Sequence, residues 1–225
     1  MTSKPLISFD TIASGHVYFL DPEEYPDWPD CFQNNHSLKL EIGFGNGNFL
    51  IEKAIQHPED NFIGMDFYHK GIRKIITRLD RLKIENVRVV YGDAREKFPM
   101  IFQDGELSEI YINFPDPWPK KRHFKRRLIK PPFVELLSRK LAAEGTLRVA
   151  TDYEPYAVEI IDFIEADPHL SNKNMEGGFS AERTDCPKTK YEKTFLNAGK
   201  KIYYLDFKKV SDYMLKTPSE PASAV

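Results

Sequence analysis

The chain has 225 residues, with 32 Lys and Arg against 34 Asp and Glu, and hydrophobic residues make up 41% of it. This composition is typical of a soluble globular protein with one substantial core. No apolar run approaches the roughly 20 residues of a membrane span, and the N-terminus lacks a signal peptide pattern, so we expect a cytoplasmic protein that does not associate with membranes. Cys31 and Cys186 lack metal-ligand spacing, which predicts free thiols and no metal site.

Residues 1–36 show no sustained period and are predicted to form an N-terminal extension, in which Trp28, Cys31 and Phe32 could fold back on the domain. A regular alternation of strands and helices follows. Strands are predicted at 37–43, 61–66, 86–93, 108–114 and 146–152. Helices are predicted at 49–57, 70–82, 131–141 and 153–164.

This alternation predicts βαβ units, hence an α/β fold with a doubly wound, mostly parallel sheet and helices on both faces. The last third of the chain differs. Residues 179–183 and 201–207 are predicted as strands without a long helix between them, pairing as an antiparallel C-terminal edge. The main domain is predicted to span 37–210, and 211–225 are predicted as a flexible tail.

Acidic residues stand at or near the end of every strand in the regular part of the chain. They are Glu41, Asp66, Asp93, Asp116 and Asp152. Open α/β sheets bind ligands at the carboxyl ends of their strands, so these acids are predicted to line one rim. Taken singly, each acid could instead be a helix cap or a loop carboxylate.

A glycine loop, Gly43-Phe-Gly45-Asn-Gly47, lies between the first of these strands and its helix. The dinucleotide fingerprint requires a sixth-position glycine, where this chain has Asn48, and there is no Walker Lys-Ser/Thr pair. Glu41 would repel a pyrophosphate and favour a ligand with an ammonium group. Asp66 has the position of a carboxylate that binds ribose hydroxyls, and Asp93 could accept from an adenine amino group. Together they favour S-adenosylmethionine over NAD.

The segment 120–130 carries seven fixed positive charges in eleven residues and no acid. In a nearly neutral chain, such a cluster creates a local field that suits a nucleic acid, although most such runs are only solvated surface. It follows Asp116, which is held between Pro115 and Pro117. The pattern places a carboxylate next to a phosphate-binding surface.

Four motifs, at 40–47, 115–127, 150–152 and 189–192, resemble those of the bacterial tRNA (guanine-N7-)-methyltransferases, in the same order. The resemblance covers roughly residues 38–207. It implies a Rossmann-like class I methyltransferase that transfers a methyl group from S-adenosylmethionine to N7 of guanine 46 in the tRNA variable loop. Such an enzyme would bind tRNA, need no metal, and act as a monomer or homodimer.

The resemblance also implies roles for individual residues. Asp116 is the implied catalytic residue. The cofactor-binding set is Glu41, Asp66, Asp93 and Asp116, beside the loop glycines Gly43, Gly45 and Gly47. The substrate-binding set is Lys120, Asp152, Thr189, Lys190, Tyr191 and Glu192, with Thr189 and Glu192 expected on a loop of the same rim. The RNA-contacting set is Arg122, His123, Phe124, Lys125, Arg126 and Arg127. A local alternative is that Thr189 caps a turn and Glu192 pairs with Lys190 or Lys193.

The chemistry constrains the role of Asp116. Guanine N7 carries no proton at neutral pH, so no base is needed to create the nucleophile. We expect Asp116 to stabilise the developing positive charge, or to accept from the guanine N1–H and N2–H₂ edge, rather than to abstract a proton.

Three other interpretations remain open at this level. One is a nucleotide-dependent oxidoreductase on the same fold. Another is a methyltransferase acting on an amino or amide nitrogen of another nucleic acid or a protein, because 113–116 loosely resembles the Asn-Pro-Pro-aromatic loops of such enzymes. The third is an RNA-binding module that has lost its cofactor.

Overall fold

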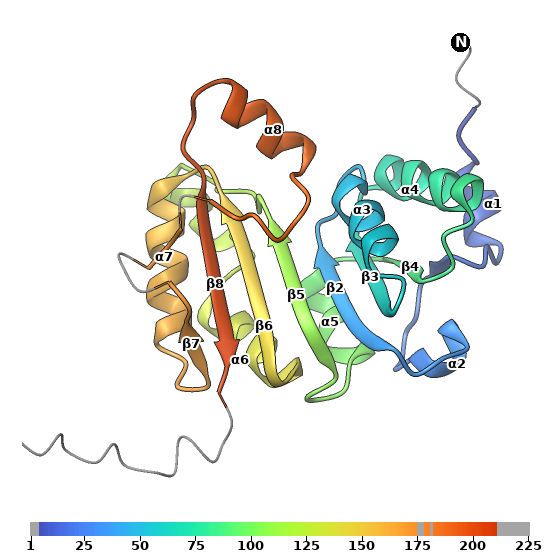
Figure 1. Cartoon of the computed structure of the whole chain (residues 1–225), viewed down its shortest axis with the longest axis horizontal. Helices are drawn as coiled ribbons and strands as arrows, with labels where there is room; N and C mark the ends of the chain where they lie inside the picture. The colour runs from blue at the N-terminus through green and yellow to red at the C-terminus, as the bar shows by residue number, and fades with distance from the viewer. Residues whose placement is uncertain (1–4, 175–177, 181, 211–225) are drawn as a thin grey trace, which may run out of the picture.

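The computed structural model describes residues 5–174, 178–180 and 182–210, which form one eight-stranded sheet in the order β1-β4-β3-β2-β5-β6-β8-β7 (Figure 1). Its strands are β1 Phe19–Leu20, β2 Ser37–Ile42, β3 Asp60–Asp66, β4 Val87–Tyr91, β5 Leu107–Asn113, β6 Leu141–Thr151, β7 Leu170–Asn172 and β8 Tyr203–Lys209. Every neighbouring pair is parallel except β6–β8 and β7–β8. The predicted mostly parallel sheet with an antiparallel C-terminal edge is confirmed.

Helices cover both faces of the sheet (Figure 1). They are α1 Phe9–Ala13, α2 Trp28–Phe32, α3 Asn48–Gln56, α4 His69–Leu82, α5 Ala94–Ile101, α6 Pro131–Lys140, α7 Glu154–Glu165 and α8 Lys190–Asn197, with a 3₁₀ helix, η1, at Lys121–Arg126. Helix α5 was not predicted, since Pro99 interrupts its pattern. Within the part of the chain that the structure describes, no helix is long and apolar enough to span a bilayer.

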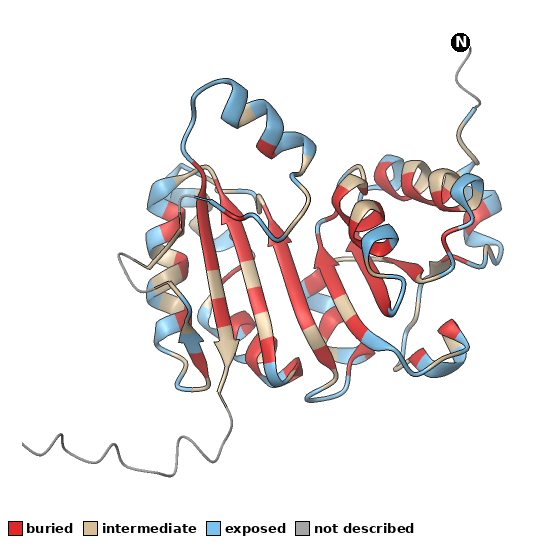
Figure 2. Ribbon diagram, in the orientation of Figure 1, coloured by how far each residue is buried: buried red, intermediate tan, exposed pale blue. Residues whose placement is uncertain are grey.

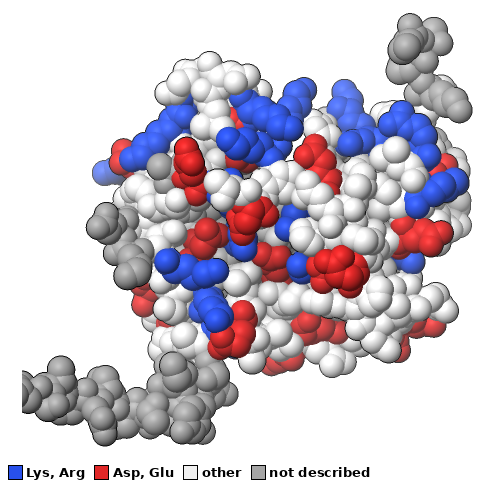
Figure 3. All heavy atoms as spheres, in the orientation of Figure 1, with Lys and Arg blue, Asp and Glu red and all other residues white. Residues whose placement is uncertain are grey.

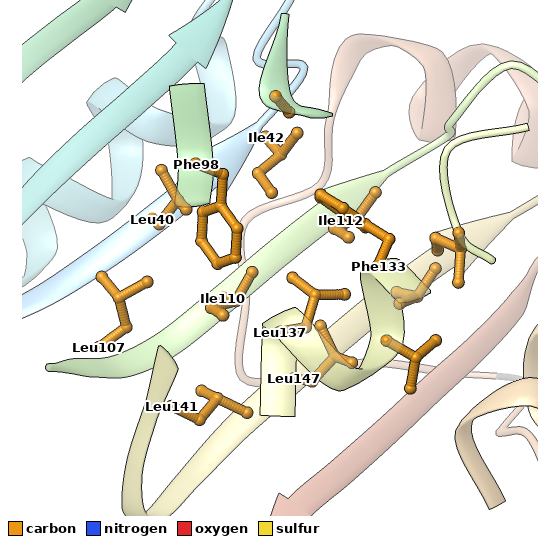
Figure 4. Packing of buried hydrophobic residues seen from close by; sticks show 14 of the residues in the cluster. Leu40, Ile42, Phe98, Leu107, Ile110, Ile112, Phe133, Leu137, Leu141 and Leu147 are labelled. Carbon is orange, nitrogen blue, oxygen red and sulfur yellow. The ribbon is translucent and has the colours of Figure 1, made fainter. Parts of the chain in front are cut away.

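The central strands are apolar on one face and polar on the other. Leu40, Ile110 and Leu147 point toward α5 and α6, where they pack with Phe98 and Phe133 (Figure 4). Figure 2 shows that these strands are buried along most of their length, whereas α8 is mostly exposed. Period-two alternation therefore builds the main core on a single side of β2, β5 and β6.

The opposite face of these strands carries ion pairs between buried acids and half-buried cations. Arg148 Nε lies 2.7 Å from Glu109, and Lys39 Nζ lies 2.7 Å from Asp60. Arg148 Nη1 also contacts Asp185, from the segment that precedes α8. Because buried charges need partners, this face depends on a covering segment that brings its own polar groups.

The C-terminal third differs from the prediction. Of the residues in the predicted strand 179–183 that the structure describes, only Ser180 pairs, in an isolated bridge to Tyr204, and β7 forms the edge instead. Helix α8 lies between the two predicted strands. Thr189 is its N-cap, and the side chains of Thr189 and Glu192 form a capping box where the sequence analysis expected a loop. The predicted tail 211–225 lies outside the described residues.

The segment before β2 packs into the domain. Trp28 is fully buried, donates from Nε1 to the Ile101 carbonyl at 3.0 Å, and stacks on Phe102. The predicted folding back of Trp28 and Phe32 is thus confirmed, because both belong to the main core. Strand β1, which was not predicted, extends the sheet by pairing with β4.

We therefore expect Trp28→Ala to lower the free energy of unfolding by about 3–5 kcal/mol, because it removes a fully buried indole and its hydrogen bond. Urea unfolding followed by circular dichroism measures this. Val17→Ala, at a side chain 67% exposed, is the matched control and should stay within about 0.5 kcal/mol. A loss below about 1 kcal/mol for Trp28→Ala would show that this segment folds independently of the domain.

Candidate active site

Two cavities meet at the carboxyl ends of β2 and β5. Their volumes are about 450 and 510 Å³. Both are lined by Gly43 and by the segment 113–116, which forms the wall between them. Strand order reverses between β2 and β5, because the chain continues outward to β3 on one side and to β6 on the other. Ligands of open α/β sheets bind at this position.

The glycine loop is held in a left-handed conformation. Gly43, Gly45 and Gly47 have φ of 75°, 57° and 68°, which side-chain-bearing residues rarely adopt. Helix α4 packs directly against the loop, since a Cβ at Gly71 would lie 2.5 Å from the Gly45 carbonyl oxygen. Gly43 and Gly45 line the cavities, whereas Gly47 is buried at the start of α3 and lines neither.

The first cavity contains the predicted acids Asp66 and Asp93. Asp66 accepts from the backbone N–H groups of Gly45, at 2.8 Å, and Tyr68, at 3.0 Å, and burial raises its pKa. Asp93 caps α5 by accepting from the Arg95 N–H at 2.8 Å. The capping alternative is therefore realised for Asp93. A carboxylate oxygen that accepts one hydrogen bond still has a lone pair for a ligand.

The second cavity brings together residues from five separate parts of the chain. It is lined by Glu41, the glycine loop, Asp152 and the start of α8, including Thr189, Lys190 and Tyr191. Three aromatic rings stand in its wall. Tyr191, Phe114 and Phe195 lie 6.0–6.3 Å apart, and each pair is inclined by only 27–28°. The result is an apolar platform beside acidic groups.

The wall between the cavities has an unusual backbone. Phe114 and Trp118 adopt φ of 54° and 41°, and the Phe114 N–H is held by the Ala150 carbonyl at 2.7 Å. Such conformations persist only where the surroundings impose them. Asp116 lies between these residues, is exposed to both cavities, and makes no hydrogen bond or ion pair within the described ranges. Its carboxylate is available to a ligand from either side.

Glu41 is buried and only half satisfied. Its Oε1 accepts from the Asn113 side chain at 3.0 Å. The Leu50 backbone amide faces the carboxylate, but Oε2 makes no hydrogen bond of acceptable geometry among the residues described. Burial raises the pKa of Glu41 to about 7, with a smaller contribution from Asp66. An ammonium group at this oxygen would satisfy it, so the site fits a ligand of the kind that the sequence indicated.

The basic segment is divided between surface and interior. Arg122, Lys125 and Arg126 are exposed, and Arg126 also lines the first cavity. Arg127 was predicted to contact RNA, but its side chain is 1% exposed. It donates from Nε to the Pro117 carbonyl at 2.8 Å and pairs with Glu159 of α7. Arg127 is an internal anchor because α7 supplies its counter-charge.

Other predicted residues fall in different places. Lys120 is exposed and lines neither cavity, while His123 and Phe124 are half-buried in η1. Glu192 is buried within α8, where it accepts from the Tyr204 hydroxyl at 2.6 Å, rather than lying on a loop. The local alternative is correct for Thr189, which caps α8, but among the described contacts Glu192 forms no ion pair with Lys190 or Lys193.

Two residues were missed by the sequence analysis. Asn113 lies in the shared wall, and Arg183 donates to its Oδ1 from Nη2 at 2.9 Å. The signal for Asn113 was a polar residue at the end of an apolar strand. Nothing local marked Arg183.

The chain is similar in sequence to known methyltransferases. A family model described as "Putative methyltransferase" matches residues 35–205. A tRNA (guanine-N(7)-)-methyltransferase of Geobacter metallireducens is 37% identical over 198 residues, covering 87% of this chain and 94% of the relative. One of the same name from Alkalilimnicola ehrlichii is 41% identical over 170 residues, covering 76% of this chain and 71% of that protein.

Among solved structures, the aminoglycoside resistance methyltransferase NpmB1 superposes with a TM-score of 0.59 at 15% identity, over 82% of this chain and 92% of that one. The 16S rRNA methyltransferase KamB superposes with a TM-score of 0.57 at 13% identity, over 84% and 96%. At these identities the likeness establishes the class I methyltransferase fold alone.

The raised pKa of Glu41 predicts a pH dependence of stability. Unfolding returns its pKa from about 7 to 4.5, so folding takes up a proton between these values and the free energy of unfolding falls as pH rises through that window. Across this window the free energy of unfolding of the wild type should fall by about 3 kcal/mol relative to that of Glu41→Gln. Urea unfolding from pH 4.5 to 7.5 measures it, with Glu135→Gln on the exposed side of α6 as control. A wild-type curve parallel to that of Glu41→Gln would contradict the assignment.

Proposed function

Because the chain belongs to the tRNA (guanine-N7-)-methyltransferase family, we propose that it transfers a methyl group to N7 of guanine 46 in the variable loop of tRNA. Its methyl donor is S-adenosylmethionine. The observation that carries the proposal is the position of Asp116, in the one wall that both cavities share. We further propose that the protein acts in the cytoplasm, as a monomer or homodimer and without a metal.

The acids that would bind the two ends of the donor lie in different cavities. Asp66 and Asp93, in the first cavity, would hold its ribose hydroxyls and adenine amino group. Glu41, on the other side of the glycine loop, would hold its ammonium group through the unpartnered Oε2. When bound there, the donor supplies an electrophilic methyl on a sulfonium. The residues that would hold the two ends of the donor therefore lie in different cavities, on either side of the shared wall.

The second cavity fits an unstacked base. Tyr191, 64% exposed, together with Phe114 and Phe195 offers near-parallel ring faces on which a guanine can stack. Sequence-specific recognition of RNA commonly uses single-stranded bases stacked on aromatic rings. Asp116 and Asp152 line the same cavity and can accept from the N1–H and N2–H₂ edge, which adenine lacks.

Asp116 then acts by electrostatics. Methylation at N7 creates a cationic base, and a fixed carboxylate beside it stabilises that charge as it develops. The strained backbone from Phe114 to Trp118 holds the carboxylate in place, because a displacement at carbon needs accurate alignment. N7 carries no proton to remove, so no proton transfer is assigned to Asp116.

Cationic side chains surround the entrance to the site. Arg122 and Lys125 are exposed on η1, and Lys190 and Lys193 are exposed on α8. Figure 3 shows Lys and Arg gathered along the edge of the molecule that carries α8 and α4. These groups would bind phosphates of the tRNA and deliver the variable loop to the second cavity, adding affinity without reading sequence.

The decisive experiment is methyl transfer to bulk tRNA with the product nucleoside identified by mass. We expect 7-methylguanosine, and none when guanine 46 is replaced by adenosine. Asp116→Asn should lower kcat roughly 100- to 1000-fold, because the charge stabilisation is lost. Another methylated nucleoside would overturn the proposed substrate. A large solvent isotope effect, with activity following one group that titrates near neutrality, would instead make Asp116 a base.

The tRNA surface is tested by Arg122→Ala/Lys125→Ala. Both side chains are exposed and line neither cavity, unlike Arg126, so donor binding should not change. The affinity for tRNA should fall, and the slope of log K against log salt should become shallower by about 1 to 2. Filter binding at four salt concentrations measures both quantities.

Lys208→Ala is the control, since Lys208 lies at the far end of β8 and pairs with Glu144. An unchanged salt slope in the double variant would remove η1 from the tRNA surface.

A further inference from the structure

A chain of polar contacts runs beneath both cavities. Asn113 is its centre, because its amide donates to Glu41 Oε1 at 3.0 Å and accepts from Arg183 Nη2 at 2.9 Å. All three side chains are buried. The amide therefore links the acid of the donor site to an arginine that comes from the segment before α8.

The chain continues from Arg183 to α8. The Arg183 guanidinium lies over the ring of Tyr204, 5.2 Å from its centroid, and the Tyr204 hydroxyl donates to Glu192 Oε1 at 2.6 Å. The other oxygen of Glu192 accepts from the backbone N–H of Thr189 at 3.1 Å, which fixes the first turn of α8. That turn carries Lys190 and Tyr191 into the second cavity.

Burial of the Arg183 guanidinium costs free energy, because the side chain is only partly hydrogen-bonded. Arg183 Nη1 is buried without a hydrogen-bond partner among the residues described, and so is Glu41 Oε2. A half-satisfied buried network is less stable than an apolar core of the same shape. Stability alone therefore does not account for a cation in this position.

The side chain also has properties that a lysine would lack. The guanidinium lies against two aromatic rings, of Phe49 in α3 and of Tyr204, while its edge donates to Asn113. Only a planar cation can use its faces and its edge at once. Arg183 thus contacts the glycine-loop helix α3, strand β5 and strand β8 together.

We propose that Arg183 is a positioning residue that couples the binding of the donor to the placement of the base, orienting Glu41 through Asn113 and fixing α8 through Tyr204 and Glu192. This rests on the proposed function for its tRNA readout. Binding of the donor and placement of the base then depend on one buried side chain that touches neither ligand.

The coupling predicts a shift in the pH dependence of donor binding. The groups that face Glu41 are Asp66 from β3, Asn113 from β5, the Leu50 backbone amide from α3, and Arg183. Asp66 raises the pKa of Glu41, whereas the Arg183 charge lowers it. Removing that charge raises this pKa further. Since an ammonium group binds the ionised carboxylate, half-maximal donor binding should then need a higher pH.

The test compares Arg183→Met, which removes the charge and the fork, with Arg183→Lys, which keeps the charge alone. Calorimetry with S-adenosylmethionine from pH 5.5 to 8.5, without tRNA, should show the midpoint displaced upward in Arg183→Met and less so in Arg183→Lys. The KM for tRNA should rise roughly tenfold in both, because each loses the fork. Arg139→Met, at an exposed arginine of α6, is the matched control.

Tyr204→Phe separates the two arms of the path. It removes only the hydroxyl that holds Glu192, so the KM for tRNA should rise while donor binding keeps the wild-type pH profile. Thermal unfolding shows whether each variant folds. If Arg183→Met does not fold, the comparison of Arg183→Lys and Tyr204→Phe with the wild type tests the coupling. Wild-type pH profiles and tRNA KM in folded Arg183 variants would overturn the coupling. A wild type that binds donor but methylates no tRNA would overturn the proposed function and leave the pH test standing.

Discussion

The reversal of strand order between β2 and β5 is the constraint on which the site depends. The two strands are hydrogen-bonded neighbours, but the chain leaves them in opposite directions, and the segments that follow diverge above their carboxyl ends. The glycine loop follows β2, and the strained segment with Asp116 follows β5. Because the connections that follow β2 and β5 leave in opposite directions, a crevice opens between them, and both segments line it.

The same two strands also carry the polar face that lies beneath the site. Their alternation directs Leu40, Ile42, Ile110 and Ile112 into the main core, and sends Glu41 and Asn113 to the other side. Buried charges on that side are neutralised by partners from later segments, as Glu109 is by Arg148. Folding of the C-terminal third is therefore needed to complete the environment of residues in the first half of the chain. The contacts that neutralise these buried charges therefore also complete the surroundings of the site.

The basic segment shows how one short run of residues can serve two surfaces. In a 3₁₀ helix, residues three apart lie on the same side, so Arg122 and Lys125 share the outer face of η1. Arg127, just after η1, turns inward, where Glu159 and the faces of Phe124 and Tyr156 hold it. Arg126 lies between these extremes and lines the first cavity. The proposed RNA surface and the first cavity are thus contiguous.

The sequence by itself determined the alternation of strands and helices, the glycine loop and the rim of acids. The alternation follows from apolar periods of 2 and 3.6 residues, and the glycine loop from backbone conformations that require glycine. The acids could be placed because each lies next in sequence to the strand that positions it. Tertiary structure alone decided that Arg127 is an anchor, that Glu192 is buried in α8, and that Arg183 reaches Asn113 across 70 residues of chain. The environment of a charged side chain depends on partners remote in sequence. A local pattern carries no information about which partners folding will bring to it.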